Sequence, residues 1–239
     1  MSVFADTPVL CGHRGSGRGE HENTLVSYRE AVACGLRWVE VDARITADDV
    51  LVARHDPVTG DGRFVADLPA AETDELGIMR VADLLEDLPP EVAVDVDVKT
   101  SLEDALRPRE CTTAALVAGL LRPEQARREL LVTSFDPAAL LIVRERTPAL
   151  ALGLLTWTRF PLRKAIAAAA HLGVAVVAAN VESFVERDTA AALGVAHEAG
   201  LQVAAWCPEA EEQDALIEAG IDCLVIDDVP AAAARLPSA

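Results

Sequence analysis

The feature that most constrains the fold of this chain is the regular alternation of short apolar strands with helices. Over the second half of the chain, strands are expected at 130–135, 151–155, 174–180, 202–207 and 223–227. Helices are expected around them, at 112–121, 137–146, 161–172, 188–199 and 209–219. A strand followed by a helix, repeated roughly every 25 residues, is typical of a parallel β-sheet.

Three further strands in the first half complete a set of eight. Apolar runs that begin near Val9, Trp38 and Val92 indicate these strands, with a short extra strand at 50–53 and a polar loop at 57–77. Eight strand–helix units predict an α/β fold, a closed (β/α)8 TIM barrel. We expect one domain over residues 1–239, with a small excursion after the second strand. A doubly wound open sheet is the alternative architecture.

The chain is strongly acidic, with 39 Asp and Glu against 21 Lys and Arg, a formal net charge of −18. Because nucleic acids and anionic membranes favour basic surfaces, this charge argues against nonspecific binding to either. No run of 18 apolar residues lacks charge or proline, so no integral membrane segment is expected. The first residues lack a secretory pattern, and five scattered cysteines without a CxxC pair predict reduced thiols and a cytoplasmic location.

Two of the expected strands each carry two carboxylates on one face. Glu40 and Asp42 alternate with apolar residues, and Asp95 and Asp97 alternate with valines. Adjacent carboxylates repel each other without a cation, and their hard oxygens suit Mg²⁺ or Ca²⁺. A solvated strand face is the alternative for one strand alone. The uniformly apolar opposite faces of both strands favour a buried binding site.

The barrel prediction brings the remaining reactive residues to the same end. Catalytic groups of such barrels lie at the carboxyl ends of strands and in the loops that follow them. His13 and Arg14 follow the first strand, His55 lies in the excursion, Lys99 ends the third strand and Trp206 ends the seventh. Arginine and lysine bind anions, and two histidines can serve as base and acid. Together with a divalent cation, these groups indicate displacement at phosphorus.

The same residues carry a resemblance to the glycerophosphodiester phosphodiesterase family. It covers nearly the whole chain. Asp97-Val98-Lys99 stands where that family has Glu-Ile-Lys. The other motifs that resemble the family are Gly12-His13-Arg14-Gly15, Glu22-Asn23-Thr24, Glu40-x-Asp42, His55-Asp56, Ser134-Phe135-Asp136 and Trp206.

The resemblance implies a metal-dependent (β/α)8 barrel that splits a small-molecule glycerophosphodiester into an alcohol and glycerol 3-phosphate. The implied route begins with attack on phosphorus by the substrate's own glycerol 2-hydroxyl, and water then opens the cyclic phosphate. The implied Mg²⁺ or Ca²⁺ ligands are Glu40, Asp42 and Asp97, the acid–base pair is His13 and His55, the phosphate contacts are Arg14 and Lys99, and Trp206 lines the glycerol or leaving-group side.

Departures from the family pattern leave two alternative functions open. Asp97 is one methylene shorter than the family's glutamate, so Asp95 or a bridging water is expected to assist it. A phospholipase D-type activity on lysophospholipids would need an apolar lip, for which Phe160, Pro161 and Leu162 are the candidates. A non-catalytic phosphate-binding relative is the other alternative, and the Asp97 substitution is the one feature that favours it.

Overall fold

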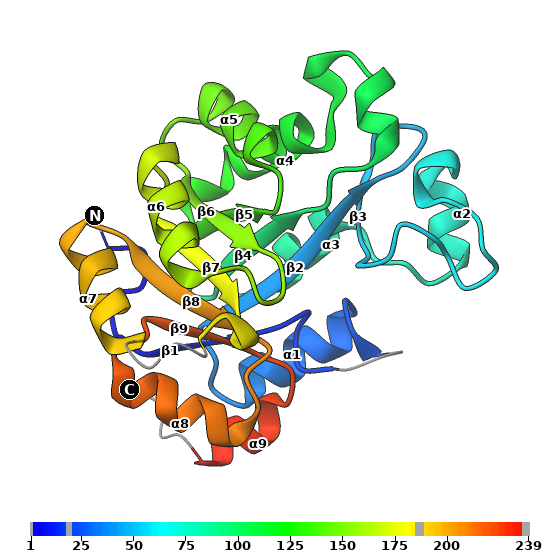
Figure 1. The fold of residues 1–239 in the computed structure, drawn as a ribbon. Helices are drawn as coiled ribbons and strands as arrows, with labels where there is room; N and C mark the ends of the chain where they lie inside the picture. Colours follow the sequence, from blue (N-terminus) through cyan, green and yellow to red (C-terminus); the bar gives the residue numbers. More distant parts are fainter. Residues whose placement is uncertain (1, 18–20, 185–188, 236–239) are drawn as a thin grey trace.

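A closed barrel of eight parallel strands forms the centre of the protein (Figure 1). The computed structural model describes residues 2–17, 21–184 and 189–235. Around the barrel the order is β1-β9-β8-β7-β6-β5-β4-β2, and β1 also pairs with β2, which closes the ring and excludes the open sheet. The short β3 adds antiparallel to β2. The strands are β1 (Val9–Gly12), β2 (Trp38–Ile45), β3 (Leu51–Ala53), β4 (Ala93–Val98), β5 (Leu130–Ser134), β6 (Ala151–Thr156), β7 (Val176–Asn180), β8 (Gln202–Trp206) and β9 (Cys223–Ile226).

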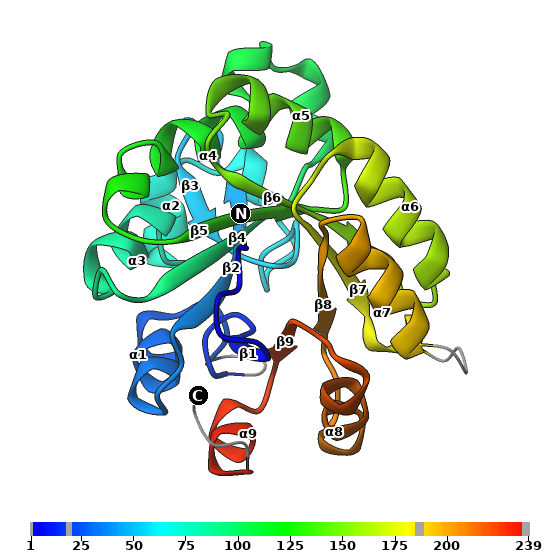
Figure 2. The same cartoon turned by 90° about the vertical axis from the view of Figure 1, so that its left-hand side faces the viewer.

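Helices surround the strands on the outside (Figure 2). They are α1 (Leu25–Ala33), α2 (Ala70–Glu75), α3 (Val81–Asp87), α4 (Thr113–Leu121), α5 (Pro137–Arg146), α6 (Leu162–Leu172), α7 (Thr189–Glu198), α8 (Ala210–Ala219) and α9 (Val229–Arg235). The helices expected in the second half agree with α4 to α8 to within one residue at each end, although Asp188, the expected start of α7, lies outside the described residues. In the parts of the chain that the structure describes, no helix has the length and apolarity that a membrane crossing needs.

Alternation along the strands divides the core into two parts. Outward-facing residues such as Val39, Val41 and Val94 pack against the helices in the larger apolar cluster. Inward-facing Trp38 and Leu131 fill the bottom of the barrel with other apolar side chains, and Phe4 packs edge-on against Trp38 at a centroid distance of 5.2 Å. Apolar side chains thus fill the interior of the barrel near the amino-terminal ends of the strands. The inward-facing polar residues of the barrel lie toward the carboxyl ends of the strands.

The excursion after β2 is more ordered than the polar loop expected at 57–77. It contains the 3-10 turn Val65–Asp67 and helix α2, and α2 extends away from the barrel (Figure 1). The Asp48 side chain accepts a hydrogen bond of 2.8 Å from the backbone N–H of Ala70, the first residue of α2. This helix start is therefore satisfied by a carboxylate 22 residues away, which local sequence signals do not reveal.

The loop after β1 approaches its surroundings too closely for any side chain at Gly12. An added Cβ there would lie 2.3 Å from the carbonyl oxygen of Gly15. The next residues, His13 and Arg14, begin the turn, and Arg14 has a φ of 52°. The Arg14 carbonyl accepts hydrogen bonds from the Asn23 N–H at 3.0 Å and the Ser27 hydroxyl at 2.9 Å. The surrounding structure thus holds this turn in a conformation that the local backbone disfavours.

We expect Gly12→Ala to lower the free energy of unfolding by about 1–3 kcal/mol, the range for overpacked sites, because the new methyl group meets backbone. Gly119→Ala in α4 is the matched control, since nothing lies within 4 Å of its added Cβ. It should raise stability by up to about 1 kcal/mol, the gain from alanine over glycine in a helix. Urea denaturation measures both changes, and equal stability of the two variants would contradict the close approach at Gly12.

Candidate active site at the barrel mouth

Three buried carboxylates on the neighbouring strands β2 and β4 converge inside the barrel. Oxygen atoms of Glu40, Asp42 and Asp97 all lie within 4.8 Å of one another. Register explains the convergence, because Asp42 and Asp97 are direct partners across the parallel β2–β4 pair. The shorter side chain of Asp97 therefore still reaches the other two acids.

Two cationic side chains lie against these acids. The Lys99 ammonium is 3.0 Å from Asp42 Oδ1 and also hydrogen-bonds to Asp97. The Arg14 guanidinium Nε is 3.1 Å from Asp42 Oδ2, and the Arg14 backbone N–H donates to Glu40 Oε2 at 3.0 Å. A second guanidinium nitrogen donates to Glu22 at 2.8 Å. Each of the three carboxylates thus touches at least one group that Arg14 or Lys99 supplies.

The acids differ in how well their charges are compensated. Burial raises the pKa of Glu40 well above its usual value, and the charges of Asp42 and Asp97 add to this rise. Burial alone would also raise the pKa of Asp42, but Lys99 and Arg14 outweigh it and hold that pKa at about 2. For Lys99, the nearby Asp97 and Asp42 outweigh burial and raise the ammonium pKa. The two cations therefore favour the ionised form of Asp42, whereas burial and the neighbouring acids disfavour the ionised form of Glu40.

The arrangement fits a hard divalent cation. Asp97 Oδ1 is buried and has no hydrogen-bond partner among the described residues. Three carboxylates are the donor set that Mg²⁺ or Ca²⁺ uses, and a bound cation would lower the cost of ionising Glu40. Asp95 is not part of this group: it pairs in register with Glu40, one step deeper, and accepts a hydrogen bond of 2.9 Å from the Thr133 hydroxyl. Its expected assistance to Asp97 has no geometric support.

A buried amide orients the central acid of the group. The Asn23 side chain donates to Asp42 Oδ2 at 2.8 Å, and its own oxygen accepts a hydrogen bond of 2.9 Å from the Tyr28 hydroxyl. Asn23 has a φ of 55°, a region that asparagine tolerates better than most residues. The sequence analysis noted Asn23 as part of a motif but gave no role to Tyr28, whose only sequence signal is a position on the inner face of α1.

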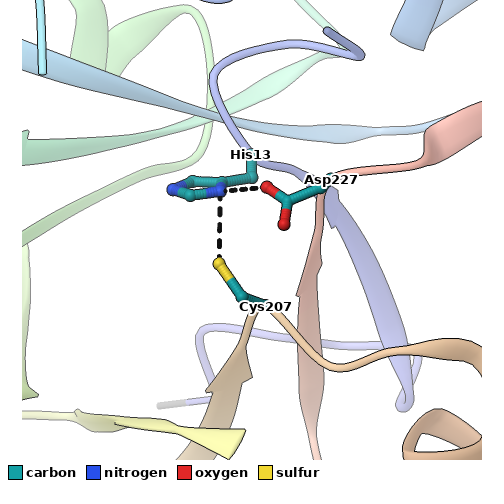
Figure 3. A group of neighbouring side chains, drawn as sticks. All are labelled: His13, Cys207 and Asp227. Atoms are coloured by element: carbon teal, nitrogen blue, oxygen red, sulfur yellow. Dashed lines mark hydrogen bonds and ion pairs between the residues drawn. The ribbon is translucent and has the colours of Figure 1, made fainter. Parts of the chain in front are cut away.

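His13 is held by a residue from the other end of the chain (Figure 3). His13 Nδ1 is 2.6 Å from Asp227 Oδ1, just after β9, and its Nε2 is 3.9 Å from Glu40 Oε2. An ionised carboxylate can only accept a hydrogen bond, so Nδ1 carries the proton and Nε2 presents a lone pair toward the acidic group. Asp227 belongs to a motif of the last strand, Ile226-Asp227, that also resembles the family, but the sequence analysis assigned this residue no role. Its signal is the alternation of Cys223, Val225 and Asp227 along the inward face of the last strand.

His55 lies at the rim and not among the buried acids. Its Nδ1 is 2.9 Å from the carboxylate of Asp56, and its side chain is 41% exposed. The guanidinium of Arg44, an inward-facing residue of β2 two positions after Asp42, donates to the His55 carbonyl at 2.8 Å. Arg44 therefore ties the backbone of His55 to the strand that carries two of the acids.

Aromatic side chains form the side of the mouth next to Lys99. The Lys99 ammonium lies 5.6 Å from the centroid of the Phe135 ring. Phe135 stacks on Trp157 with centroids 4.3 Å apart and meets Trp206 edge-on at 6.1 Å. Trp206 thus lies beside the site as expected, whereas the roles of Phe135 and Trp157 were not anticipated.

Two of the three residues expected to form an apolar lip do not form one, and only Pro161 is exposed. Leu162 is fully buried, and Phe160 packs against the core between barrel and helices. The large apolar side chains that are exposed on the loops after β4 and β6 are Leu102, Leu106 and Trp157, with exposed fractions of 82%, 90% and 68%. They follow strands on either side of β5, so they flank the loop that carries Phe135.

A cavity of about 800 Å³ lies at the opposite end of the barrel. Its lining includes Val9 and Trp38 at the starts of β1 and β2, and Glu91 and Glu129 just before β4 and β5. Because it contains none of the acids and cations described above, cavity size does not locate the reactive residues here.

Comparison with known proteins identifies the family of this chain. The model of the glycerophosphoryl diester phosphodiesterase family matches residues 13–231. A glycerophosphodiester phosphodiesterase of Caldanaerobacter subterraneus is 21% identical, over 92% of this chain and 94% of the relative.

Solved structures of low sequence identity share the fold. A glycerophosphoryl diester phosphodiesterase from Silicibacter pomeroyi superposes with a TM-score of 0.80 at 22% identity, over 98% of this chain and 95% of the other. A phosphodiesterase from Oleispira antarctica, solved with the product sn-glycerol-3-phosphate, gives a TM-score of 0.80 at 22% identity, over 99% and 100% of the two chains. Since the family model spans the barrel from His13 to the start of its last helix, the chain belongs to the glycerophosphoryl diester phosphodiesterase family.

Proposed function

We propose that this protein hydrolyses small-molecule glycerophosphodiesters to an alcohol and glycerol 3-phosphate, with a divalent cation held by Glu40, Asp42 and Asp97. The observation that carries the proposal is the convergence of these buried acids within 4.8 Å, next to Lys99 and Arg14. Family membership and the glycerol 3-phosphate bound to the Oleispira antarctica relative support the substrate class.

The cation would supply charge neutralisation at the phosphate, and the donor set favours Mg²⁺ or Ca²⁺. Arg14 and Lys99 are proposed to bind the phosphate oxygens, Arg14 with its planar fork and Lys99 as a compact charge. Both are already fixed by the acids, so little side-chain entropy is lost when the substrate binds. Trp206, with Phe135, would line the side of the mouth that receives glycerol or the leaving group.

His13 is proposed as the base and His55 as the acid. With Asp227 holding the proton of Nδ1, the lone pair of His13 Nε2 takes the proton of the attacking hydroxyl, and Asp227 stabilises the imidazolium that forms. The attacking group is the substrate's glycerol 2-hydroxyl. His55 would protonate the departing alkoxide from the rim, where the alcohol leaves. Water then opens the cyclic phosphate, and the product is glycerol 3-phosphate.

We expect release of glycerol 3-phosphate from glycerophosphocholine and glycerophosphoethanolamine in the presence of Mg²⁺ or Ca²⁺, and its loss with a chelator. Asp97→Asn should lower kcat/KM by more than about 100-fold, because losing a ligand should cost more than losing an outer partner. His13→Ala and His55→Ala should each lower kcat by about 100-fold or more, the usual contribution of an acid or base.

A coupled assay for glycerol 3-phosphate measures these rates, and a diester that lacks the 2-hydroxyl tests the route. Equal cleavage of that analogue would rule out the cyclic intermediate. Binding of the diester without cleavage, with either cation, would instead favour the non-catalytic phosphate-binding alternative.

The variant Asp95→Asn tests whether Asp95, the buried acid one step below the three proposed metal ligands, differs from them in its role. It should lower metal-dependent kcat/KM less than Asp97→Asn does, because the most that it can remove is an outer contact of the group, whose loss costs about 10–100-fold at a metal site. Burial raises the pKa of Asp95 well above its usual value, so the folded state disfavours the charged form.

The wild type should therefore lose stability relative to this variant as the pH rises from about 4, the unfolded pKa, toward the folded pKa of Asp95. In chelator at pH 8, we expect Asp95→Asn to be more stable than the wild type, because asparagine removes the charge that burial disfavours. The difference should shrink toward pH 4. Thermal unfolding of both proteins across this pH range measures the difference in stability. A variant that is less stable than the wild type at pH 8 would contradict the buried charge at Asp95.

A phospholipase D-type activity on lysophospholipids is the second candidate function. It is favoured by the exposed Leu102, Leu106 and Trp157, because exposed large apolar side chains beside a polar site offer contact for an acyl chain.

The double variant Leu102→Ser/Leu106→Ser should distinguish the two substrate classes. If lysophospholipids are substrates, kcat/KM for lysophosphatidylcholine should fall by about tenfold, roughly the 1.5 kcal/mol or more that burial of a leucine contributes. The same parameter for glycerophosphocholine should not change, since neither leucine contacts the acidic group. Leu141→Ser on α5, another exposed leucine, is the matched control. An unchanged rate with lysophosphatidylcholine would remove the support for this candidate.

A further inference from the structure

A second group of potential metal ligands lies on the far side of the His13 ring (Figure 3). Ligand atoms of His13, Cys207 and Asp227 lie within 4.8 Å of one another, at the ends of the adjacent strands β1, β8 and β9. Both hydrogen bonds drawn in Figure 3 end on the same ring nitrogen, Nδ1, at 2.6 Å from Asp227 Oδ1 and 3.5 Å from Cys207 Sγ. This group therefore differs from the acidic group in composition, with one nitrogen, one sulfur and one oxygen donor.

We propose that His13 Nδ1, Cys207 Sγ and Asp227 Oδ1 form an inhibitory site for a thiophilic divalent cation such as Zn²⁺. Only the inhibitory effect of the cation rests on the proposed function. The binding site itself depends on the three donors and not on the reaction. Softer cations favour sulfur and nitrogen ligands, whereas Mg²⁺ and Ca²⁺ favour oxygen, so the two groups should select different ions.

The distances suit tetrahedral zinc with a modest adjustment. Bond lengths of about 2.0 Å to nitrogen and 2.3 Å to sulfur at a tetrahedral angle place the two donors about 3.5 Å apart. The observed separation of Nδ1 and Sγ is 3.5 Å. The same geometry places nitrogen and oxygen about 3.3 Å apart, so Asp227 must withdraw by about 0.7 Å from its present hydrogen bond at 2.6 Å. Water would complete the coordination.

The surroundings of Cys207 disfavour oxidation and leave the site open to ions. Burial raises the pKa of the Cys207 thiol to about 12, and the negative charge of Asp227 adds to the effect. A thiol that keeps its proton is a poor nucleophile toward oxidants, which argues against a redox sensor here. Of the charged groups that act on the thiol, Asp227 and Glu40 are negative and Arg14 is positive. The group is only half-buried at the open end of the barrel, so an ion can reach it.

Occupancy would change the protonation pattern of His13. On binding, the thiol proton of Cys207 passes to solvent, and bonds form from the cation to sulfur, to His13 Nδ1 and to Asp227. The ring proton leaves Nδ1, and the neutral imidazole then carries its proton on Nε2, facing Glu40 at 3.9 Å. His13 can no longer accept a proton at Nε2 from the substrate, and the reaction stops with the acidic group untouched.

The test uses the full chain with Mg²⁺ or Ca²⁺ held at saturation, and compares the wild type with Cys207→Ser and Cys111→Ser. Serine keeps the shape at a position with a φ of 56°, and Cys111, a half-buried free cysteine on a loop between β4 and α4, is the matched control. The first readout is the Zn²⁺ concentration that halves glycerol 3-phosphate release, with each variant scaled to its own uninhibited rate. The second is a titration with Cd²⁺, followed by thiolate-to-metal charge-transfer absorption in the ultraviolet, which needs no activity.

We expect the wild type and Cys111→Ser to bind one equivalent of Cd²⁺ with this absorption and Cys207→Ser to lose it. The inhibitory Zn²⁺ concentration should rise by at least about tenfold in Cys207→Ser alone, by analogy with the loss of metal-site partners. Equal inhibition of all three proteins would mean that Zn²⁺ acts elsewhere, for example at the acidic group, and would overturn the proposal. Charge-transfer absorption that survives in Cys207→Ser would overturn it as well. If the protein lacks phosphodiesterase activity, the absorption titration still decides whether the site exists.

Discussion

Repulsion between carboxylates in a closed barrel is the constraint on which the site depends. The parallel register of β2 and β4 sets Glu40 beside Asp95 and Asp42 beside Asp97, so four acids share one corner of the interior. Such a corner is tolerable only if protons or cations balance it, because buried like charges cannot all ionise. Lys99 and Arg14 meet part of that need, and both come from loops or strand ends that the same barrel positions.

The loops that follow the strands supply the other side chains of the mouth. The turn after β1 carries Arg14 in a left-handed conformation and is braced by Asn23 and Ser27. The excursion after β2, which includes β3, brings His55 to the rim. There the Arg44 guanidinium donates a hydrogen bond to the His55 carbonyl. The loops after β5 and β6 supply the stacked Phe135 and Trp157. Charge is therefore concentrated in one half of the mouth and aromatic surface in the other, which matches a diester with an anionic centre and a variable alcohol.

Much of the fold could be predicted from the sequence because its signals are local. Alternating apolar residues marked the strands, and Gly173, Gly200 and Gly220, with φ values of 70°, 76° and 92°, end or follow α6, α7 and α8. Helix α2 could not be predicted in this way, because its start is satisfied by the distant Asp48. Helix α9 is short and begins with a valine and a proline after Asp228, whose carboxylate accepts from the Ala231 N–H, a weak signal in an alanine-rich run.

Within the site, the sequence could place the acids on the inward faces of two strands, since these positions follow from period-two alternation. Contacts between residues that lie far apart in the sequence could not be predicted from it. Nothing local links Tyr28 to Asn23 and Asp42, or Cys207 to His13, because these contacts exist only after the ring closes. The prediction that Phe160 and Leu162 form an apolar lip at the mouth was wrong for a similar reason. Both residues are apolar, but the loop turns them toward the core and leaves Trp157 exposed.

Closure of the ring by β1 between β2 and β9 has a consequence for biosynthesis. His13 leaves the ribosome 214 residues before its partner Asp227. The acidic group and its two cations, by contrast, all lie between β1 and the residue that follows β4, so they are synthesised long before Asp227. The histidine acquires its orientation only when the last strand inserts beside the first. Contacts of such long sequence separation carry a high entropic cost of loop closure, and here one of them orients the histidine that is proposed to accept a proton.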